Sequence, residues 1–281
     1  MELSDFQTIA RQYKVICFDS YGVLKNHAGI IPGINNTLKS LREEGIDFYV
    51  LTNDASRSPQ KLAAKYQDAG VGEVLPELMI SSGMLARDYL EAKVKGGIVA
   101  YLGTPESAHY IRTAGMETIA IGELDLADAD KINALVLLDD EGFDWEQDIN
   151  RAINLLRVRN IPVVVANSDR TYPVSGGQVA VAIGGIANLM EQMVSKKFLR
   201  FGKPDTQMFH YAYSLIQAKQ PVEKKDILMV GDTLITDILG GNKFGIDTVL
   251  VLTGNTLAKR ASSKIEITGI VPTYICESVG S

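Results

Sequence analysis

The chain has 281 residues, of which 46% are hydrophobic and 22% charged, and it carries a formal net charge of −6 at pH 7. This length allows one large domain or two modest ones, each able to bury a core. The acidic balance argues against nucleic acid or an anionic membrane as a partner, and no apolar stretch approaches the roughly 18 residues of a membrane span. The N-terminal residues also lack the layout of a signal peptide, so we expect a cytoplasmic protein.

The two cysteines, Cys17 and Cys276, form neither a disulfide framework nor a metal-binding spacing. We therefore expect both to be buried thiols.

An apolar run at residues 14–18 stops at Asp19, and the chain then turns at Gly22. Such a run is typical of a buried strand in a parallel sheet. Asp19 would then lie at the carboxyl end of the strand, where the loops of open α/β sheets form the ligand crevice. An acid in this place is a candidate nucleophile or metal ligand, although an isolated aspartate is often only a cap or turn residue.

Strands and helices alternate after this turn. We expect a helix from Ile34 to Leu41 that stops at Gly45, and a strand at 48–51 that ends in Thr52-Asn53-Asp54. A helix opened by Ser58-Pro59 and a short strand at 78–80 follow. This alternation predicts an α/β fold with a doubly wound parallel sheet.

A second set of strands follows a helix at about 84–93. We expect its strands at 98–102, 118–121, 134–138 and 161–166, with a helix at 145–159 and another near 186–194. Strands resembling the first set resume later, which indicates that the second set is inserted. We therefore predict a core domain of residues 1–93 and 195–281 and an inserted α/β cap domain of residues 94–194.

The returning segment repeats the pattern of an apolar strand followed by an acid. Gly202-Lys203-Pro204 precedes a helix, and a strand at 227–230 ends in Gly231-Asp232, with Asp237 five residues further on. We expect the last strand at 248–252, before Thr253-Gly254.

Four segments bring polar side chains to one edge of the sheet. They carry Asp19, Thr52, Lys203, and Asp232 with Asp237. Carboxylates crowded there repel each other, and a hard divalent cation such as Mg²⁺ relieves the repulsion. Thr52 can donate a hydrogen bond to a phosphoryl oxygen, and Lys203 can neutralise its charge. Attack by Asp19 on phosphorus would give an aspartyl-phosphate that water then cleaves. Asp232 and Asp237 would complete the cation site.

These residues resemble the four motifs of the haloacid dehalogenase superfamily: Asp19 in D-x-x-G-V, Thr52 after a strand, Lys203 in G-K-P, and Asp232 and Asp237 in G-D-x-x-x-x-D. The resemblance spans nearly the whole chain. The segments 52–53, 167–169, 202–204, 236–238 and 249–254 look like those of class IIA phosphatases, a group that includes pyridoxal phosphatase, phosphoglycolate phosphatase, 4-nitrophenyl phosphatase and bacterial nucleotide phosphatases.

The resemblance implies a catalytic and metal-binding set. Asp19 would be the nucleophile and a Mg²⁺ ligand, and the backbone carbonyl of Tyr21 and Asp232 would be further ligands. Asp237 would be either a Mg²⁺ ligand or an acid that contacts the ligands without binding the ion directly.

The resemblance also implies a phosphate-binding set of Thr52, Asn53 and Lys203. The substrate would be a small phosphorylated metabolite such as a sugar phosphate, a nucleotide or a cofactor phosphate. Caps of this class also pair in homodimers, so a homodimer through the cap is a further expectation.

The chain departs from the superfamily pattern at two positions. Most phosphatases of the superfamily carry an aspartate two residues after the nucleophile, where it acts as general acid and base, whereas this chain has Tyr21. The pKa of a phenol is about 10, and the loss of such help typically costs about 10²–10⁴ in rate. We therefore expect slow turnover, or turnover limited to good leaving groups. Ile235 stands where class IIA members often have another aspartate, which predicts weaker Mg²⁺ binding.

Two other hypotheses stay open on the sequence. The 2-haloacid dehalogenases share the D-x-Y-G pattern, but their cap lies between the first two motifs, and only 33 positions separate Asp19 from Thr52. A phosphate- or metal-binding protein that has lost turnover is the second alternative.

The inserted segment should close over the site, exclude water and select the substrate. Five polar residues at its loop ends could face the ligand, although each is more often a turn residue. They are Asp139, Asp140, Asn167, Asp169 and Arg170.

Overall fold

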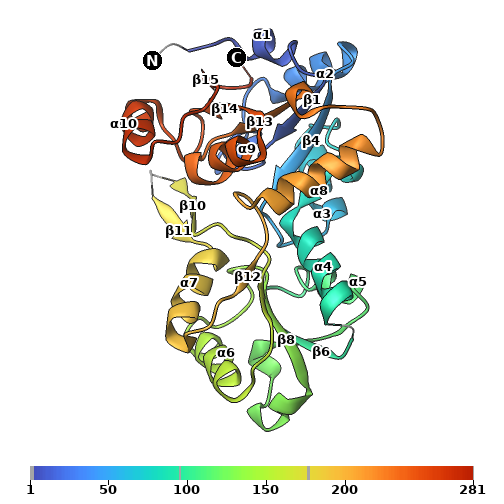
Figure 1. Ribbon diagram of the computed structural model, residues 1–281, viewed down its shortest axis with the longest axis vertical. Helices are drawn as coiled ribbons and strands as arrows, with labels where there is room; N and C mark the ends of the chain where they lie inside the picture. Colours follow the sequence, from blue (N-terminus) through green and yellow to red (C-terminus); the bar gives the residue numbers. More distant parts are fainter. Residues whose placement is uncertain (1–2, 95, 176–177, 281) are drawn as a thin grey trace.

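The computed structural model describes residues 3–94, 96–175 and 178–280 and contains a six-stranded parallel sheet in its upper part (Figure 1). The strand order is β15-β14-β13-β1-β4-β5, and every neighbouring pair runs parallel. The strands are β1 (Val15–Phe18), β4 (Asp47–Thr52), β5 (Met79–Ser81), β13 (Ile227–Gly231), β14 (Asp247–Val251) and β15 (Tyr274–Cys276). This arrangement confirms the predicted doubly wound α/β core.

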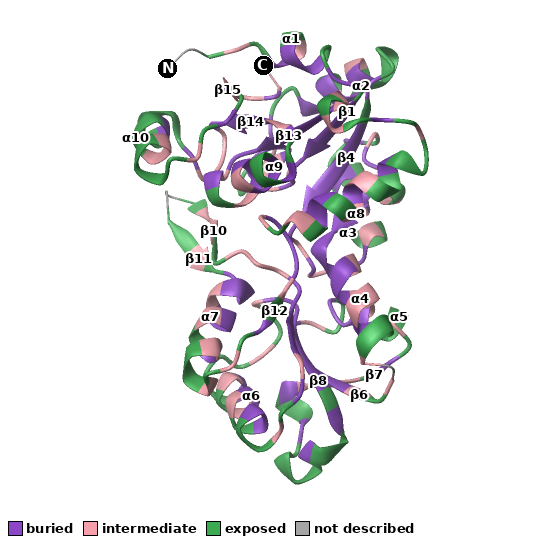
Figure 2. Cartoon of the chain, in the orientation of Figure 1, coloured by how far each residue is buried: buried purple, intermediate pink, exposed green. Residues whose placement is uncertain are grey.

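Strand β1 is buried on both faces, which explains its unbroken apolar run. Val15 and Cys17 pack in one hydrophobic cluster with Met208 of helix α8 (Thr206–Gln217). Ile16 and Phe18 pack in another with Leu38 of helix α2 (Ile34–Glu43). Helices thus cover both sides of the sheet, as a parallel sheet requires. Figure 2 shows the resulting buried centre of the sheet. Both cysteines are buried and free, as predicted.

A second parallel sheet lies in the lower part of the molecule (Figure 1). Its order is β12-β9-β8-β6-β7, and a separate hydrophobic cluster packs it against two helices. Its elements are β6 (Ile98–Leu102), β7 (Glu117–Ala120), β8 (Ile132–Leu137), β9 (Val163–Val165), β12 (Leu199–Arg200), α6 (Gln147–Val158) and α7 (Ile183–Val194). The second sheet is therefore inserted between β5 and α8, as the sequence indicated.

The boundaries of the inserted unit are set by this sheet. Strand β12 pairs with β9 through Leu199 and Val164, although the sequence-based division assigns residues from 195 onward to the core. We therefore propose that the insertion, which we call the cap, extends from about residue 94 to residue 200.

Two expectations about the strands were wrong or incomplete. The strand at 247–251 is not the last one, because β15 adds to the edge of the core sheet beside β14. Two short hairpins were also missed, β2 (Lys25–Asn26) with β3 (Gly29–Ile30), and β10 (Thr171–Pro173) with β11 (Val179–Val181). Strands of two or three residues carry too little alternation for a sequence pattern to identify them.

The remaining helices surround the two sheets. Among the residues that the structure describes, none of the helices has both the length and the apolar character needed to cross a membrane. The remaining α- and π-helices are α1 (Phe6–Ala10), α2 (Ile34–Glu43), α3 (Pro59–Asp68), α4 (Ser82–Lys93), α5 (His109–Thr113), α8 (Thr206–Gln217), the π-helix η6 (Leu234–Ile238), α9 (Leu239–Phe244) and α10 (Ala258–Thr268).

Candidate active site

Three neighbouring strands of the core sheet carry the predicted polar residues at their carboxyl ends. Asp19 directly follows β1, Thr52 is the last residue of β4, and Asp232 directly follows β13. Strand β1 lies between β4 and β13, and it is the point where the chain changes the direction in which it adds strands. Ligands of open α/β sheets bind at such a switch point.

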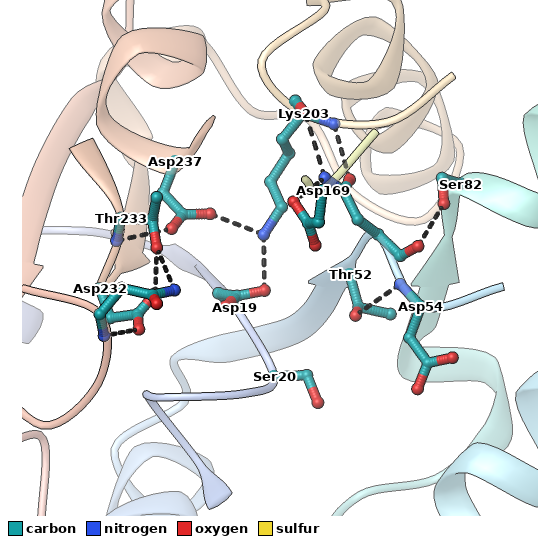
Figure 3. Close-up of polar contacts among 12 residues, drawn as sticks. Asp19, Ser20, Thr52, Asp54, Ser82, Asp169, Lys203, Asp232, Thr233 and Asp237 are labelled. Atoms are coloured by element: carbon teal, nitrogen blue, oxygen red, sulfur yellow. Dashed lines mark hydrogen bonds and ion pairs between the residues drawn. The ribbon is translucent and has the colours of Figure 1, made fainter. Parts of the chain in front are cut away.

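Lys203 joins two of the predicted carboxylates (Figure 3). Its Nζ atom lies 2.6 Å from Oδ1 of Asp19 and 2.6 Å from Oδ1 of Asp237, and the side chain is only 2% exposed. Burial acts to lower the pKa of Lys203, but the two carboxylates outweigh it and hold this pKa above its ordinary value. The structure thus places a permanent cation beside the candidate nucleophile.

Asp19, Asp232 and Asp237 form a compact acidic cluster, whose ligand atoms all lie within 4.8 Å of one another. Burial, together with the charge of Asp237, raises the pKa of Asp232 to about 7. Asp237 is held from η6, and its Oδ2 atom accepts a hydrogen bond of 3.1 Å from the backbone N–H of Thr233. The protein therefore keeps three carboxylates at a spacing that is unfavourable without a positive charge.

Two glycines leave space for Asp232. A side chain at Gly22, which has a φ of +93°, or at Gly254 would collide with Oδ2 of Asp232. The hydroxyl of Thr253 donates a 2.6 Å hydrogen bond to the carbonyl of Gly22, and the N–H of Asn255 donates one of 2.5 Å to Asp232. The donor set is entirely oxygen, which suits a hard divalent cation of the Mg²⁺ type.

The segment after β4 holds Lys203 in place. The side chain of Asn53 accepts a 2.7 Å hydrogen bond from the N–H of Lys203 and donates one of 3.0 Å to its carbonyl. Thr52 is 4% exposed, and its hydroxyl accepts a bond of 3.1 Å from the N–H of Asp54. The side-chain amide of Asn53 is thus occupied by protein groups.

The phenol of Tyr21 is turned toward the cap. Its hydroxyl donates a 3.0 Å hydrogen bond to the carbonyl of Pro173, the last residue of β10. Burial and the charge of Asp232 raise the pKa of Tyr21 further above its ordinary value. The phenol is therefore poorly suited to exchange a proton with a substrate near neutral pH.

Of the five polar residues at the ends of the cap loops, Asp169 has a hydrogen bond to the predicted site among the described residues. Its Oδ1 atom accepts a 2.9 Å bond from the side chain of Asn53. Asn167 instead accepts a hydrogen bond from the N–H of Asp169, and Arg170 is exposed. Asp140 accepts a bond from the hydroxyl of Tyr172.

Two contributors to the acidic cluster were missed on the sequence. Thr233 binds Asp237 through its N–H and Asp232 through its hydroxyl, at 2.8 Å, and Asn255 binds Asp232. Both follow the carboxyl end of a strand, β13 or β14, as Asp19 and Asp232 do. That shared position is the signal that could have identified them.

Comparisons with known proteins identify the family of the chain. A family model described as haloacid dehalogenase-like hydrolase matches residues 16–117, and one described as HAD-hydrolase-like matches residues 200–281. The crystal structure of a "possible sugar phosphatase" of the HAD superfamily from Cytophaga hutchinsonii is 52% identical with a TM-score of 0.96, covering 100% of this chain and 99% of that chain.

More distant relatives are similar over most of their length. Chronophin from Bos taurus is 29% identical over 271 residues, which cover 94% of this chain and 90% of that protein. Dihydroxyacetone phosphatase from Corynebacterium glutamicum is 29% identical over 236 residues, with 84% and 80% covered. The relatives named as enzymes here are phosphatases, and the cap lies after the Thr52 motif, so the dehalogenase alternative is set aside. The chain belongs to the haloacid dehalogenase superfamily, in which it is a class IIA phosphatase, a phosphoric monoester hydrolase.

Proposed function

We propose that the protein is a Mg²⁺-dependent hydrolase of small phosphorylated metabolites and that Asp19 is its nucleophile. The observation that carries the proposal is the 2.6 Å contact between Lys203 and Asp19 beside the acidic cluster. The contact orients the Asp19 carboxylate at the carboxyl end of β1, where a phosphoryl group would be held. The similarity to the possible sugar phosphatase favours phosphorylated sugars or polyols as substrates.

The residues divide into two groups by the partner they would bind. Asp19, the backbone carbonyl of Tyr21 and Asp232 would hold Mg²⁺, with Asp237 behind them because Lys203 and Thr233 already engage it. Bound Mg²⁺ would neutralise the charge of the phosphoryl group and of the three carboxylates.

The second group would bind the phosphoryl oxygens. The hydroxyl of Thr52 can donate one hydrogen bond, the backbone N–H of Asn53 another, and the ammonium group of Lys203 supplies positive charge. An oxygen of Asp19 would then form a bond to phosphorus as the ester oxygen leaves, and water would cleave the aspartyl-phosphate.

Hydrolysis of 4-nitrophenyl phosphate in Mg²⁺ and in EDTA tests this function, with sugar and polyol phosphates as further substrates. We expect turnover in Mg²⁺ alone and a loss of at least about 10³-fold in Asp19→Asn. The matched control is Asp68→Asn, an exposed carboxylate at the end of α3, which should behave as the wild type. Turnover that survives in EDTA or in Asp19→Asn would overturn the proposal, as would phosphate binding without turnover in the wild type.

A further inference from the structure

The proposed reaction needs a proton donor for the ester oxygen, and the position where superfamily phosphatases carry an acid holds Tyr21. The phenol hydrogen is already donated to Pro173 at 3.0 Å. A half-buried phenol with a raised pKa does not readily give up this proton near neutral pH. The core therefore leaves the leaving-group side of the site without an acid at position 21.

A carboxyl group from the cap lies at the same site. In Figure 3 the side chain of Asp169 points into the space between Lys203, Asp19 and Thr52. Its Oδ1 atom accepts the 2.9 Å bond from Asn53, which leaves Oδ2 available to a ligand. The core residues would hold the phosphoryl group, so the leaving group must extend toward the cap. Asp169 approaches from that direction.

The loop that carries Asp169 is fixed to the core. The hydroxyl oxygen of Ser82 in α4 lies 3.0 Å from the carbonyl oxygen of Asn53 and 2.5 Å from that of Ala166, so its single hydrogen is shared between the two carbonyls. The hydroxyl of Ser168 donates one of 2.8 Å to the carbonyl of Phe201. A group held in this way keeps the geometry that proton transfer requires.

We propose that Asp169 is the general acid and base of this enzyme and that Tyr21 is a positioning residue for it. Tyr21 contacts Pro173 in strand β10, which begins two residues after Asp169, and so it ties the other end of this segment to the core. The acid that most relatives place in the core would thus come from the cap. This inference rests on the proposed function.

The environment of Asp169 agrees with this role. The pKa of Asp169 is raised to about 6, mainly by burial and also by the charges of Asp237 and Asp54. The hydrogen bond from Asn53 and the charge of Lys203 act in the opposite direction and lower it. Both the protonated and the ionised forms are therefore populated near neutral pH, as a group that acts first as acid and then as base requires.

The proposed reaction has two steps. In the first step, an oxygen of Asp19 bonds to phosphorus as the bond between phosphorus and the ester oxygen breaks. The ester oxygen takes the bonding electrons and receives the proton of Asp169. The Asp169 carboxylate next removes a proton from water. The water oxygen bonds to phosphorus as the bond to Asp19 breaks, which releases inorganic phosphate and restores both carboxyl groups.

The test compares kcat/KM for 4-nitrophenyl phosphate and glycerol phosphate in the full-length wild type, Asp169→Asn and Tyr21→Phe. Asparagine can still accept the bond from Asn53 but carries no acidic proton. For Asp169→Asn we expect kcat/KM to fall about 10²–10⁴-fold with glycerol phosphate, whose alkoxide needs a proton. With 4-nitrophenyl phosphate, which has a weakly basic leaving group, it should fall less than about tenfold.

A second measurement tests Asp169 as the base that activates water in the second step. In Asp169→Asn, kcat for 4-nitrophenyl phosphate should fall and the phosphorylated enzyme should accumulate, as detected by intact mass after an acid quench. Tyr21→Phe should lower kcat/KM for glycerol phosphate to a smaller extent than Asp169→Asn, without accumulation.

Equal losses of kcat/KM for both substrates in Asp169→Asn, or no loss for either, would overturn the proposal for Asp169. Either result is distinguishable from failure of the proposed function, because that failure would appear in the wild type and in Asp19→Asn.

Discussion

The Nζ atom of Lys203 lies 2.6 Å from Oδ1 of Asp19, in a place where the lysine is 2% exposed. The same atom contacts Asp237, so one cation neutralises part of a cluster of three carboxylates. The core is therefore held together at this edge by charge balance as well as by apolar packing.

The substitution Lys203→Met should lower stability as well as activity. Removing one partner from a buried ionic network costs about 3–5 kcal/mol, because the remaining charges stay buried without compensation. Urea unfolding in EDTA should show this loss, and added Mg²⁺ should restore part of it by supplying positive charge to the carboxylates. A variant as stable in EDTA as the wild type would contradict this account.

The substitution Gly254→Ala should weaken Mg²⁺ binding. The added methyl group would collide with Oδ2 of Asp232 and with the Cα atom of Gly22, and it would displace this ligand. A disturbed ligand orientation typically costs about 10–100-fold in metal affinity, which calorimetric titration with Mg²⁺ can measure. Gly72→Ala is the control, because a methyl group there meets open space. Equal Mg²⁺ affinities in the two variants would refute the proposal that Gly254 leaves the space that Asp232 needs as a Mg²⁺ ligand.

The substitution Asn53→Ala should destabilise the protein by about 2–4 kcal/mol. The buried amide makes two hydrogen bonds to the backbone of Lys203 and one to Asp169, and unpaired buried polar groups each cost about 1–3 kcal/mol. Denaturant unfolding measures the effect. In the control Asn133→Ala, an exposed side chain with one hydrogen bond to Gly96 is lost, and the change should stay within about 0.5 kcal/mol.

Asp139 should make stability depend on pH. Burial, with the nearby charges of Asp140 and Asp54, raises the pKa of Asp139 from 3.8 to about 6, and its Oδ2 atom has no hydrogen-bond partner among the described residues. Because the pKa is higher in the folded state, this group favours folding below about pH 4, and that contribution is lost as the pH rises through about 6.

The substitution Asp139→Asn removes this effect. We expect the variant to gain about 2–3 kcal/mol relative to the wild type at about pH 8 and little at about pH 4. Urea unfolding at the two pH values measures it, with Asp68→Asn as the exposed control. Parallel stability profiles for the wild type and Asp139→Asn would rule out the role assigned to Asp139.

Much of the fold and of the site was predictable because strand and motif patterns are local. An apolar run followed by an acid located Asp19 and Asp232, and the glycine-lysine-proline segment located Lys203. The same reasoning missed β15 and the two hairpins, because strands of two or three residues carry too little alternation for a sequence pattern to identify them.

The sequence by itself determined which residue types reach the carboxyl edge of the core sheet, because the order of strands and the residues that follow them are written along the chain. Only the tertiary structure decided how these residues pair: that Lys203 bridges Asp19 and Asp237, that Asn53 is occupied by Lys203, that Tyr21 faces Pro173, and that Asp169 enters from the cap. These contacts join segments up to 184 positions apart, and packing rather than local preference selects them.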